Sequence, residues 1–319
     1  MSFTSTQQPH PLLHPPLGGE EAIILAIKVD VDTDRGTRIG VPNLITLFDE
    51  FNIKTTFLFS LGPDNTGRAI KRIFRPGFLS KVSRTSVVST YGLRTLLNGV
   101  LLPGPHVGRR NEGVMRLARD RGHEVGIHCY DHIRWQDGLV NMTRDEVYKE
   151  FSKARKEFER IFGDPARTAG SAGWQANGFS LAAYDDAHLL YASDARGTHP
   201  FIPRVDGTAY KTPQIPTTLP TLDELLGRPE YPDERIVSHY LSLLRPEGLN
   251  VLTIHAELEG MKQIALFRSL LEQVRDRRIQ VKRLADYADD LLKNPAVIPQ
   301  CDLVFGTVDG RSGTLAVQA

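Results

Sequence analysis

The chain has 319 residues, and its 39 Lys and Arg residues nearly balance its 38 Asp and Glu residues, for a formal net charge of +1. A hydrophobic content of 40% and a charged content of 24% are typical of a globular protein, without the basic excess that marks nucleic-acid-binding proteins. The two cysteines, Cys129 and Cys301, exclude a disulfide framework and favour a reducing compartment.

Neither end of the sequence resembles a folded domain. Residues 1–20 contain four prolines and two glycines, which predicts a flexible tail, and we assign residues 296–319 to a C-terminal tail as well. The first residues lack the basic start and apolar core of a secretory signal, and no apolar run reaches the ~20 residues of a membrane span. We therefore expect a cytoplasmic protein that binds a membrane only peripherally.

Short apolar runs alternate with amphipathic segments between the two ends. The expected strands are residues 22–29, 53–60, 123–128, 189–194, 250–257 and 279–284, and the expected helices are 41–52, 111–122, 143–163, 179–188, 261–277 and one after 284. This alternation predicts parallel strands joined by helical crossovers. The number of units favours an α/β fold of the distorted (β/α) barrel type, as a single domain over residues 21–295. A doubly wound open sheet has the same alternation, and periodicity does not separate the two.

The stretch EVGIHCYDH, residues 124–132, ends in two histidines four residues apart. On one helical turn, His128 and His132 would share a face and could bind a divalent metal. The related metalloprotease motif has a Glu next to the first His as general base, but here that position is Cys129. A catalytic metal site would therefore need its third ligand and its base from elsewhere. Taken alone, such a pair is also common as ordinary buried or surface histidines.

Acidic and histidine side chains follow several of the expected strands. They are Asp30, Asp32, His128, Asp194 and His255. Catalytic residues of barrel enzymes lie at the C-terminal ends of the strands, so we expect these side chains to gather on one face.

Their spacing suggests a role for each. Asp30 and Asp32 are two residues apart on a strand and point to the same side, which allows Asp32 to be the third metal ligand and Asp30 the general base. Asp194 and His255 suggest a carboxylate that orients an imidazole acting as general acid. The plainer alternatives are a turn cluster for the first pair, and a helix cap and a core histidine for the second.

The motifs DVD (30–32), HCYDH (128–132), GW (173–174), SDARG (193–197) and TIH (253–255) occur in an order that resembles the polysaccharide deacetylase family, whose core is the NodB homology domain. The longer stretches VDVDTDRGTRIGVP, HEVGIHCYDHIRWQ and IHAELEG are similar to one branch of that family. This branch removes the formyl group from 4-deoxy-4-formamido-L-arabinose-phosphoundecaprenol during lipid A aminoarabinose modification, which gives polymyxin resistance. The resemblance covers roughly residues 22 to 290.

The resemblance implies a distorted barrel and a divalent metal, commonly zinc, with cobalt or manganese as alternatives. It also implies that Asp32, His128 and His132 are the metal ligands. Asp30 would be the base, and His255 the acid, backed by Asp194.

One departure from the family concerns an arginine. Many members carry an Arg-x-Pro motif whose Arg holds the catalytic Asp, whereas the matching stretch here is AGSAGW, residues 169–174. We expect Arg196 to substitute for that arginine. We also expect Gly173 and Trp174 to contact the substrate, since small residues let the backbone approach a ligand.

Residues 65–111 form a basic and apolar insertion with nine Lys and Arg residues and no acid before Glu112. Such a composition suits an anionic membrane surface or a lipid phosphate, and we expect Arg68 and Arg72 to bind the substrate. An ordinary lid with a solvated basic face would have the same composition. Sparse aromatic residues argue against nucleic acid, and the sequence indicates no protein partner.

Three other functions stay open from the sequence. An N-deacetylase of polysaccharides or oligosaccharides would use the same residues. Two histidines and a carboxylate also bind Fe(II) in oxygenases, although such a site does not explain Asp30 and His255. A non-catalytic lipid- or sugar-binding module could retain the scaffold without turnover.

Overall fold

The computed structural model describes residues 23–69, 95 and 97–319, and a seven-stranded parallel sheet forms its centre. The strands lie in the order β5-β4-β3-β2-β1-β8, and β9 pairs with residues 24–26 of β1, on the edge opposite β8 that β2 pairs with further along. Their bounds are β1 Ile24–Val31, β2 Thr56–Ser60, β3 Glu124–Cys129, β4 Thr168–Ala169, β5 Tyr191–Ala192, β8 Leu249–His255 and β9 Gln280–Lys282. Seven of the eight residues of β1 are buried, as expected for a parallel strand covered on both faces.

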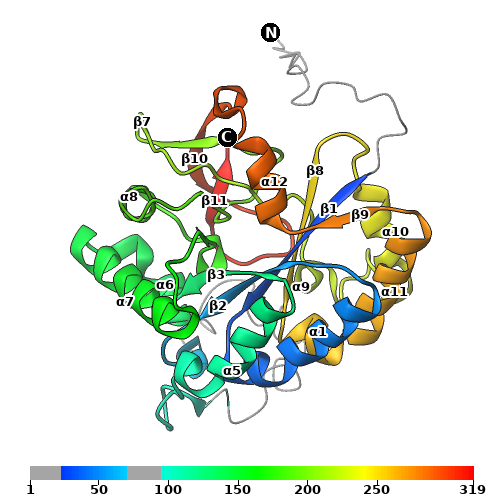
Figure 1. Cartoon of the computed structure of the whole chain (residues 1–319), viewed down its shortest axis with the longest axis horizontal. Coiled ribbons are helices and arrows are strands. Elements are labelled where there is room, and N and C mark those ends of the chain that lie inside the picture. The colour runs from blue at the N-terminus through cyan, green and yellow to red at the C-terminus, as the bar shows by residue number, and fades with distance from the viewer. Residues whose placement is uncertain (1–22, 70–94, 96) are drawn as a thin grey trace.

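Helices connect the strands and lie around the outside of the sheet (Figure 1). The α-helices are α1 Val41–Glu50, α5 Val107–Asp120, α6 His132–Gly138, α7 Arg144–Phe162, α8 Gly178–Asp186, α9 Leu222–Leu225, α10 Asp233–Leu243, α11 Ile264–Asp276 and α12 Leu284–Leu291. Short π-helical turns cover Gly36–Gly40 and Leu258–Lys262, and 3₁₀ turns cover Leu139–Asn141, Ala172–Trp174 and Pro295–Val297. The predicted alternation of strands and helices is confirmed.

The longest helix, α7, begins and ends as the sequence predicts. Thr143 accepts a hydrogen bond from the Glu146 backbone N–H, and the Glu146 carboxylate accepts one from the Thr143 N–H, so the two form a capping box. Gly163 ends the helix with φ of 83°, a conformation that glycine adopts at little cost.

The sheet is a distorted barrel rather than an open doubly wound sheet, because an extended segment bridges its two ends. Residues 212–219 run between β5 and β8: Ala192 exchanges backbone hydrogen bonds with Pro213 and Ile215, while the Thr218 and Leu219 N–H groups donate to the Val251 carbonyl. Regular strand pairing is absent from this bridge in the described residues, so the barrel is irregular there. The predicted fold class is confirmed.

A second sheet in the order β11-β10-β6-β7 changes the expectation for the C-terminus. Its strands are β6 Ile202–Val205, β7 Thr208–Ala209, β10 Gln300–Gly306 and β11 Leu315–Gln318. We expected residues 296–319 to be a tail, and this was wrong: β10 pairs with β6, and Leu303, Leu315 and Ala316 are buried. The sequence pattern that would indicate these strands was weak, because the strands are short and half exposed.

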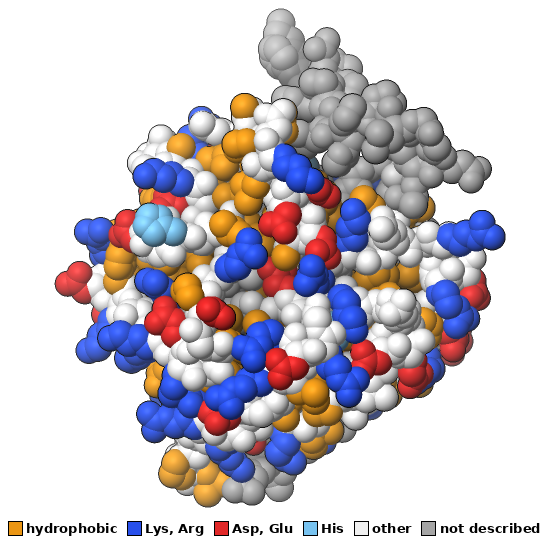
Figure 2. Space-filling view, viewed as in Figure 1, with side chains coloured by type: hydrophobic (Ala, Val, Ile, Leu, Met, Phe, Trp, Pro, Cys, Tyr) orange, Lys and Arg blue, Asp and Glu red, His pale blue; other side chains and the backbone are white. Residues whose placement is uncertain are grey.

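The surface matches the balanced composition. Figure 2 shows Lys and Arg side chains interspersed with Asp and Glu side chains over the face viewed. Within the described residues, no helix is long and apolar enough to span a bilayer. The expected N-terminal tail, residues 1–20, and much of the basic insertion lie outside those residues.

Candidate active site

Asp32, His128 and His132 come together at the C-terminal ends of β1 and β3. One Asp32 carboxylate oxygen, Oδ1, lies 3.2 Å from His128 Nε2 and 3.4 Å from His132 Nε2. The three ligand atoms lie within 4.8 Å of one another. This is the two-histidine, one-carboxylate set that leaves coordination positions open in catalytic metal sites.

The surroundings of these atoms fit a divalent cation. Asp32 Oδ1 is buried and accepts no hydrogen bond, which is costly for a carboxylate unless a cation balances it. The His128 Nδ1–H donates to the Gly170 carbonyl at 2.6 Å, so its Nε2 is the nitrogen that faces the Asp32 carboxylate and would bind the metal. Burial alone would raise the pKa of Asp32, but His132 and His128 hold it well below its usual range. The carboxylate therefore stays ionised, as a ligand must.

The two histidines do not share a helix: the strand expected over residues 123–128 is confirmed, and the single helical turn suggested for the pair was wrong. His128 belongs to β3, whereas His132 is the first residue of α6, after the N-cap Asp131. The imidazoles meet because the chain turns between strand and helix, with ring centroids 5.3 Å apart. Between them, Cys129 is buried in the core, and burial raises its pKa well above the ordinary value. A thiol in this state is not a nucleophile.

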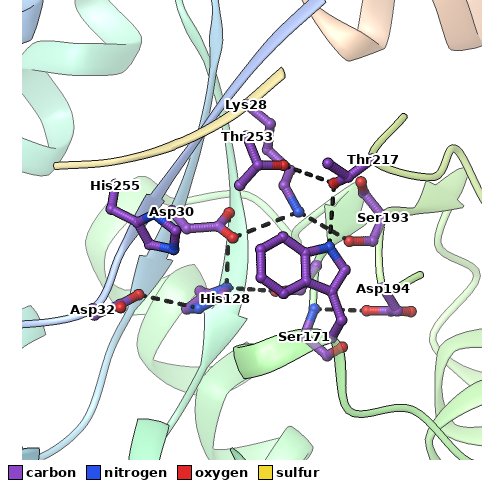
Figure 3. Close-up of polar contacts among 12 residues, drawn as sticks. Lys28, Asp30, Asp32, His128, Ser171, Ser193, Asp194, Thr217, Thr253 and His255 are labelled. Carbon is purple, nitrogen blue, oxygen red and sulfur yellow. Dashed lines mark hydrogen bonds and ion pairs between the residues drawn. The ribbon is translucent and has the colours of Figure 1, made fainter. Parts of the chain in front are cut away.

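Asp30 lies beside this group, at the position expected of a base. It is 2% exposed, and its Oδ1 accepts no hydrogen bond and lies 4.0 Å from His128 Nδ1. The other carboxylate oxygen, Oδ2, is 3.5 Å from the ammonium of Lys28, a fully buried side chain (Figure 3). Lys28 was not among the expected site residues, although a lysine within the apolar run of β1, two residues before Asp30, was a usable signal.

His255 is paired with Asp30 in register across β8 and β1. Its imidazole does not meet Asp194 as we expected. Its Nδ1 lies 4.0 Å from Asp223 Oδ1. Asp223 belongs to α9, and sequence spacing gave no indication of the approach, since the two residues come from separate segments.

Asp194 has a different position. Its carboxylate accepts hydrogen bonds from the Ser171 N–H at 2.7 Å and the Gln214 side chain at 2.9 Å. Burial raises its pKa, and these hydrogen bonds oppose the rise. Asp194 therefore anchors the loop that follows β4, and the structure gives no hydrogen bond or ion pair between it and His255.

Trp174 forms one wall of the site. Its indole N–H donates to Thr217 Oγ1 at 3.2 Å, and its ring lies 6.4 Å from the imidazole of His255, edge to face. Gly173, just before it, has φ of 62° and no room for a side chain, because a Cβ would lie 2.4 Å from Gln136 Nε2. These residues therefore shape the site, and their contact with substrate stays a prediction.

The predicted role of Arg196 does not match the structure. Its guanidinium donates to Glu224 Oε1 at 2.6 Å and to the Leu219 carbonyl at 2.9 Å, and does not pair with Asp30. A second arginine, Arg311, comes from the segment that we expected to be a tail. It lies over the Trp174 ring at 4.4 Å and pairs with Glu224 at 3.3 Å. Sequence analysis missed Arg311 because nothing local links it to the site.

The two basic residues expected to bind substrate have different outcomes. Arg68 donates from Nε to the Gly99 carbonyl at 3.0 Å, on a loop next to the site, so its role stays a prediction. Arg72 lies outside the described residues.

Comparison with known proteins agrees with this site. Residues 29–172 match the sequence profile of the polysaccharide deacetylase family. A protein of Shewanella sediminis, named a probable 4-deoxy-4-formamido-L-arabinose-phosphoundecaprenol deformylase, is 38% identical over 92% of this chain and 94% of its own length. A protein of the same name from Wigglesworthia glossinidia brevipalpis is 32% identical over 89% of this chain and 98% of its own.

A solved structure extends the match to the fold. The probable polysaccharide deacetylase of Pseudomonas aeruginosa PAO1 superposes with a TM-score of 0.57 over 90% of this chain and 98% of its own, at 15% identity. The chain belongs to the polysaccharide deacetylase family, the class of metal-dependent hydrolases of amide carbon–nitrogen bonds that the barrel and the Asp-His-His group define.

The ligand assignment predicts a loss of metal in His128→Ala. Removing Nε2 leaves two ligands, so affinity for Zn²⁺ or Co²⁺ should fall by more than about 100-fold, beyond the 10–100-fold that loss of an outer partner costs. The measurement is titration calorimetry together with metal content after dialysis. His239→Ala, a partly buried histidine on α10, is the matched control and should bind metal normally. Equal metal content in the two variants would remove His128 from the ligand set.

Glu259 predicts a pH dependence of stability. The side chain is 2% exposed and accepts a hydrogen bond from the His255 N–H, and burial raises its pKa from 4.5 to about 8. Between these values the folded chain keeps the proton while the unfolded chain loses it. The contribution of Glu259 to the free energy of unfolding should therefore fall as pH rises through this window, by up to about 1.4 kcal/mol per pH unit.

Urea unfolding of metal-stripped protein at pH 5 to 8 measures this slope, and Glu259→Gln should flatten it. Burial and the charge of Asp32 also raise the pKa of Glu257 to about 8. Glu257 should therefore keep part of the pH dependence in that variant. An unchanged slope would show that Glu259 is ionised in the folded protein.

Proposed function

We propose that this chain is a metal-dependent deformylase of 4-deoxy-4-formamido-L-arabinose-phosphoundecaprenol. The observation that carries the proposal is the 38% identity over 92% of the chain to a relative named for that activity. The site supports it, because Asp30, His255 and the Asp-His-His group supply a base, an acid and a metal position at one edge of the sheet. Zinc is the metal we expect, with cobalt or manganese as alternatives.

Held by Asp32, His128 and His132, the metal would act as a Lewis acid on the formyl carbonyl and on a water molecule. Asp30 takes the proton from the attacking water through Oδ1, the buried oxygen without a hydrogen-bond partner. His255, next to Asp30 in the register of β1 and β8, gives a proton to the departing sugar nitrogen. Asp223, facing His255 Nδ1 at 4.0 Å, orients the imidazole for that transfer.

The competing enzymatic function is N-deacetylation of an oligosaccharide, which would use the same residues. An Fe(II) oxygenase would not need the base and the acid. A binding module without turnover would not need a buried Asp30 oxygen that accepts no hydrogen bond.

The assay that tests the function is formate release from the lipid-linked formamido sugar by metal-reconstituted protein, beside acetate release from an N-acetylated chitooligosaccharide. We expect formate alone. Asp30→Asn should lower kcat by at least about 100-fold, the lower range of general-base catalysis, with metal still bound. Acetate from the oligosaccharide alone would replace deformylation by deacetylation, and metal-loaded protein inactive on both substrates would favour the binding module.

We further propose that the chain works at the cytoplasmic face of the inner membrane, which it would contact through a loop beside the site. Three consecutive apolar residues of this loop, Val100, Leu101 and Leu102, are 53%, 75% and 40% exposed. The Gly99 N–H donates to the Leu102 carbonyl and closes the turn. Arg68 bonds Gly99, so a cation lies at the base of an apolar tip, a combination suited to an anionic bilayer.

The loop is tied to the segments that carry the ligands. Asn98 Nδ2 donates to Asp64, and Asp64 also accepts from the Asp34 N–H, two residues beyond Asp32. Asn65 donates to Asp131, the N-cap of the helix that starts at His132. A membrane contact at the tip would therefore set the distance between the bilayer and the metal group.

Leu101→Glu tests this contact. The charge should reduce co-sedimentation with vesicles containing phosphatidylglycerol by severalfold, because a carboxylate at an anionic surface is repelled. Val304→Glu, an exposed apolar residue on β10, is the control and should sediment like the unmodified protein. Equal sedimentation of the two variants would exclude the loop as the contact.

A further inference from the structure

Lys28 is a fully buried lysine in the middle of strand β1. It precedes Asp30 by two residues on β1, so the two side chains leave the same face of the strand. Its ammonium lies 3.5 Å from Asp30 Oδ2, donates to the Ser193 carbonyl at 3.1 Å, and lies 5.4 Å from the centre of the Trp174 ring. Figure 3 shows Lys28 reaching between Asp30 and Ser193.

A buried ammonium is costly unless a carboxylate and hydrogen-bond acceptors compensate it. Here the carboxylate within ion-pair distance of Lys28 is Asp30, and among the described residues Asp30 has no other Lys or Arg partner. A buried ion pair contributes little net stability compared with packed apolar side chains. Its value here is positional, because the Ser193 carbonyl fixes the ammonium of Lys28 and the ammonium in turn fixes one carboxylate oxygen of Asp30.

The loop after β4 leaves room for this arrangement. A Cβ at Gly170 would lie 2.5 Å from Leu58 Cδ1 and 3.0 Å from the Ser193 carbonyl, and 3.5 Å from Lys28 Nζ. Any side chain at residue 170 would therefore crowd the carbonyl that accepts from Lys28. Gly170 also supplies the carbonyl that orients His128, so the base and a ligand are positioned from the same place.

We propose that Lys28 is the positioning residue for the catalytic base, a role that rests on the proposed function of Asp30. By pairing with Oδ2, Lys28 fixes the carboxylate and leaves Oδ1, which lies 4.0 Å from His128 Nδ1 and accepts no hydrogen bond, to take the water proton. Arg196, which sequence analysis expected in this role, is held by Glu224 and Leu219. The cation that orients the base comes from the strand of the base itself.

The test compares Lys28→Met, which keeps the length without the charge, with Lys28→Arg, which keeps the charge. Lys28→Met should lower kcat by roughly 100-fold, the cost of a misplaced catalytic group. KM should stay within about threefold and metal content unchanged, because Lys28 is not placed among the ligands or the substrate-binding residues. Lys28→Arg should recover at least a tenth of kcat. Lys54→Met, which removes a lysine paired with Asp49 at 3.1 Å, is the matched control and should leave kcat unchanged.

Unfolding supplies a readout that needs no substrate. Lys28→Met and Asp30→Asn should each lower the urea midpoint of metal-stripped protein, because each leaves one buried charge uncompensated. The double variant should unfold at a higher midpoint than either single variant, since neither charge remains. Additive losses would overturn the pairing even if Lys28→Met were too unstable to assay.

Different results would contradict the proposed function and the positioning role of Lys28. Unmodified protein that releases no formate from the lipid, combined with a coupled unfolding cycle, would count against the proposed function and not against the pairing. A Lys28→Met variant with full kcat would overturn the positioning role, and so would one whose loss lies wholly in KM. If the unmodified protein is active and Lys28→Met gives either of these results, the positioning role fails and the proposed function is unaffected.

Discussion

Hydrogen bonding between β1 and its parallel neighbours determines which side chains can meet in the active site. The register pairs Asp30 with His255 on one side and with Leu58 on the other. Because side chains alternate along a strand, Lys28 and Asp30 must then point the same way. A shift of one residue would turn both side chains to the opposite face. The core packing of β1 therefore holds the catalytic register in place.

The same strand concentrates charge where water is excluded. Lys28, Asp30 and His128 are all less than 5% exposed, and each is matched to a partner of opposite charge or to a backbone carbonyl. Asp32 and Asp30 each keep one buried oxygen without a hydrogen bond. Such atoms are rare in folded proteins because they cost free energy. Asp32 Oδ1 lies 3.2 and 3.4 Å from the Nε2 atoms of His128 and His132, and Asp30 Oδ1 lies 4.0 Å from His128 Nδ1.

Segments outside the regular barrel complete the site. Residues 212–219 bridge β5 and β8, and they bring the Thr217 hydroxyl to the indole N–H of Trp174, which donates a hydrogen bond to it. The C-terminal hairpin brings Arg311 over that ring, where it pairs with Glu224 beside Asp223. The surroundings of His255 thus depend on chain segments that follow the residues matched by the family profile. Irregular structure is tolerated here because backbone hydrogen bonds are satisfied across the bridge.

The sequence by itself determined the alternation of strands and helices, the capping of α7 and the positions of Asp30, Asp32, His128 and His255 at strand ends. These follow from local periodicity and from one rule of parallel sheets, so they need no knowledge of distant contacts. Only the tertiary structure decided that His132 begins a helix, that Asp223 and not Asp194 faces His255, and that residues 300–318 form strands. It also decided that Lys28, not Arg196, pairs with Asp30. Each of these depends on which distant segments pack together, and side-chain pairing across a fold leaves no periodic trace in the sequence.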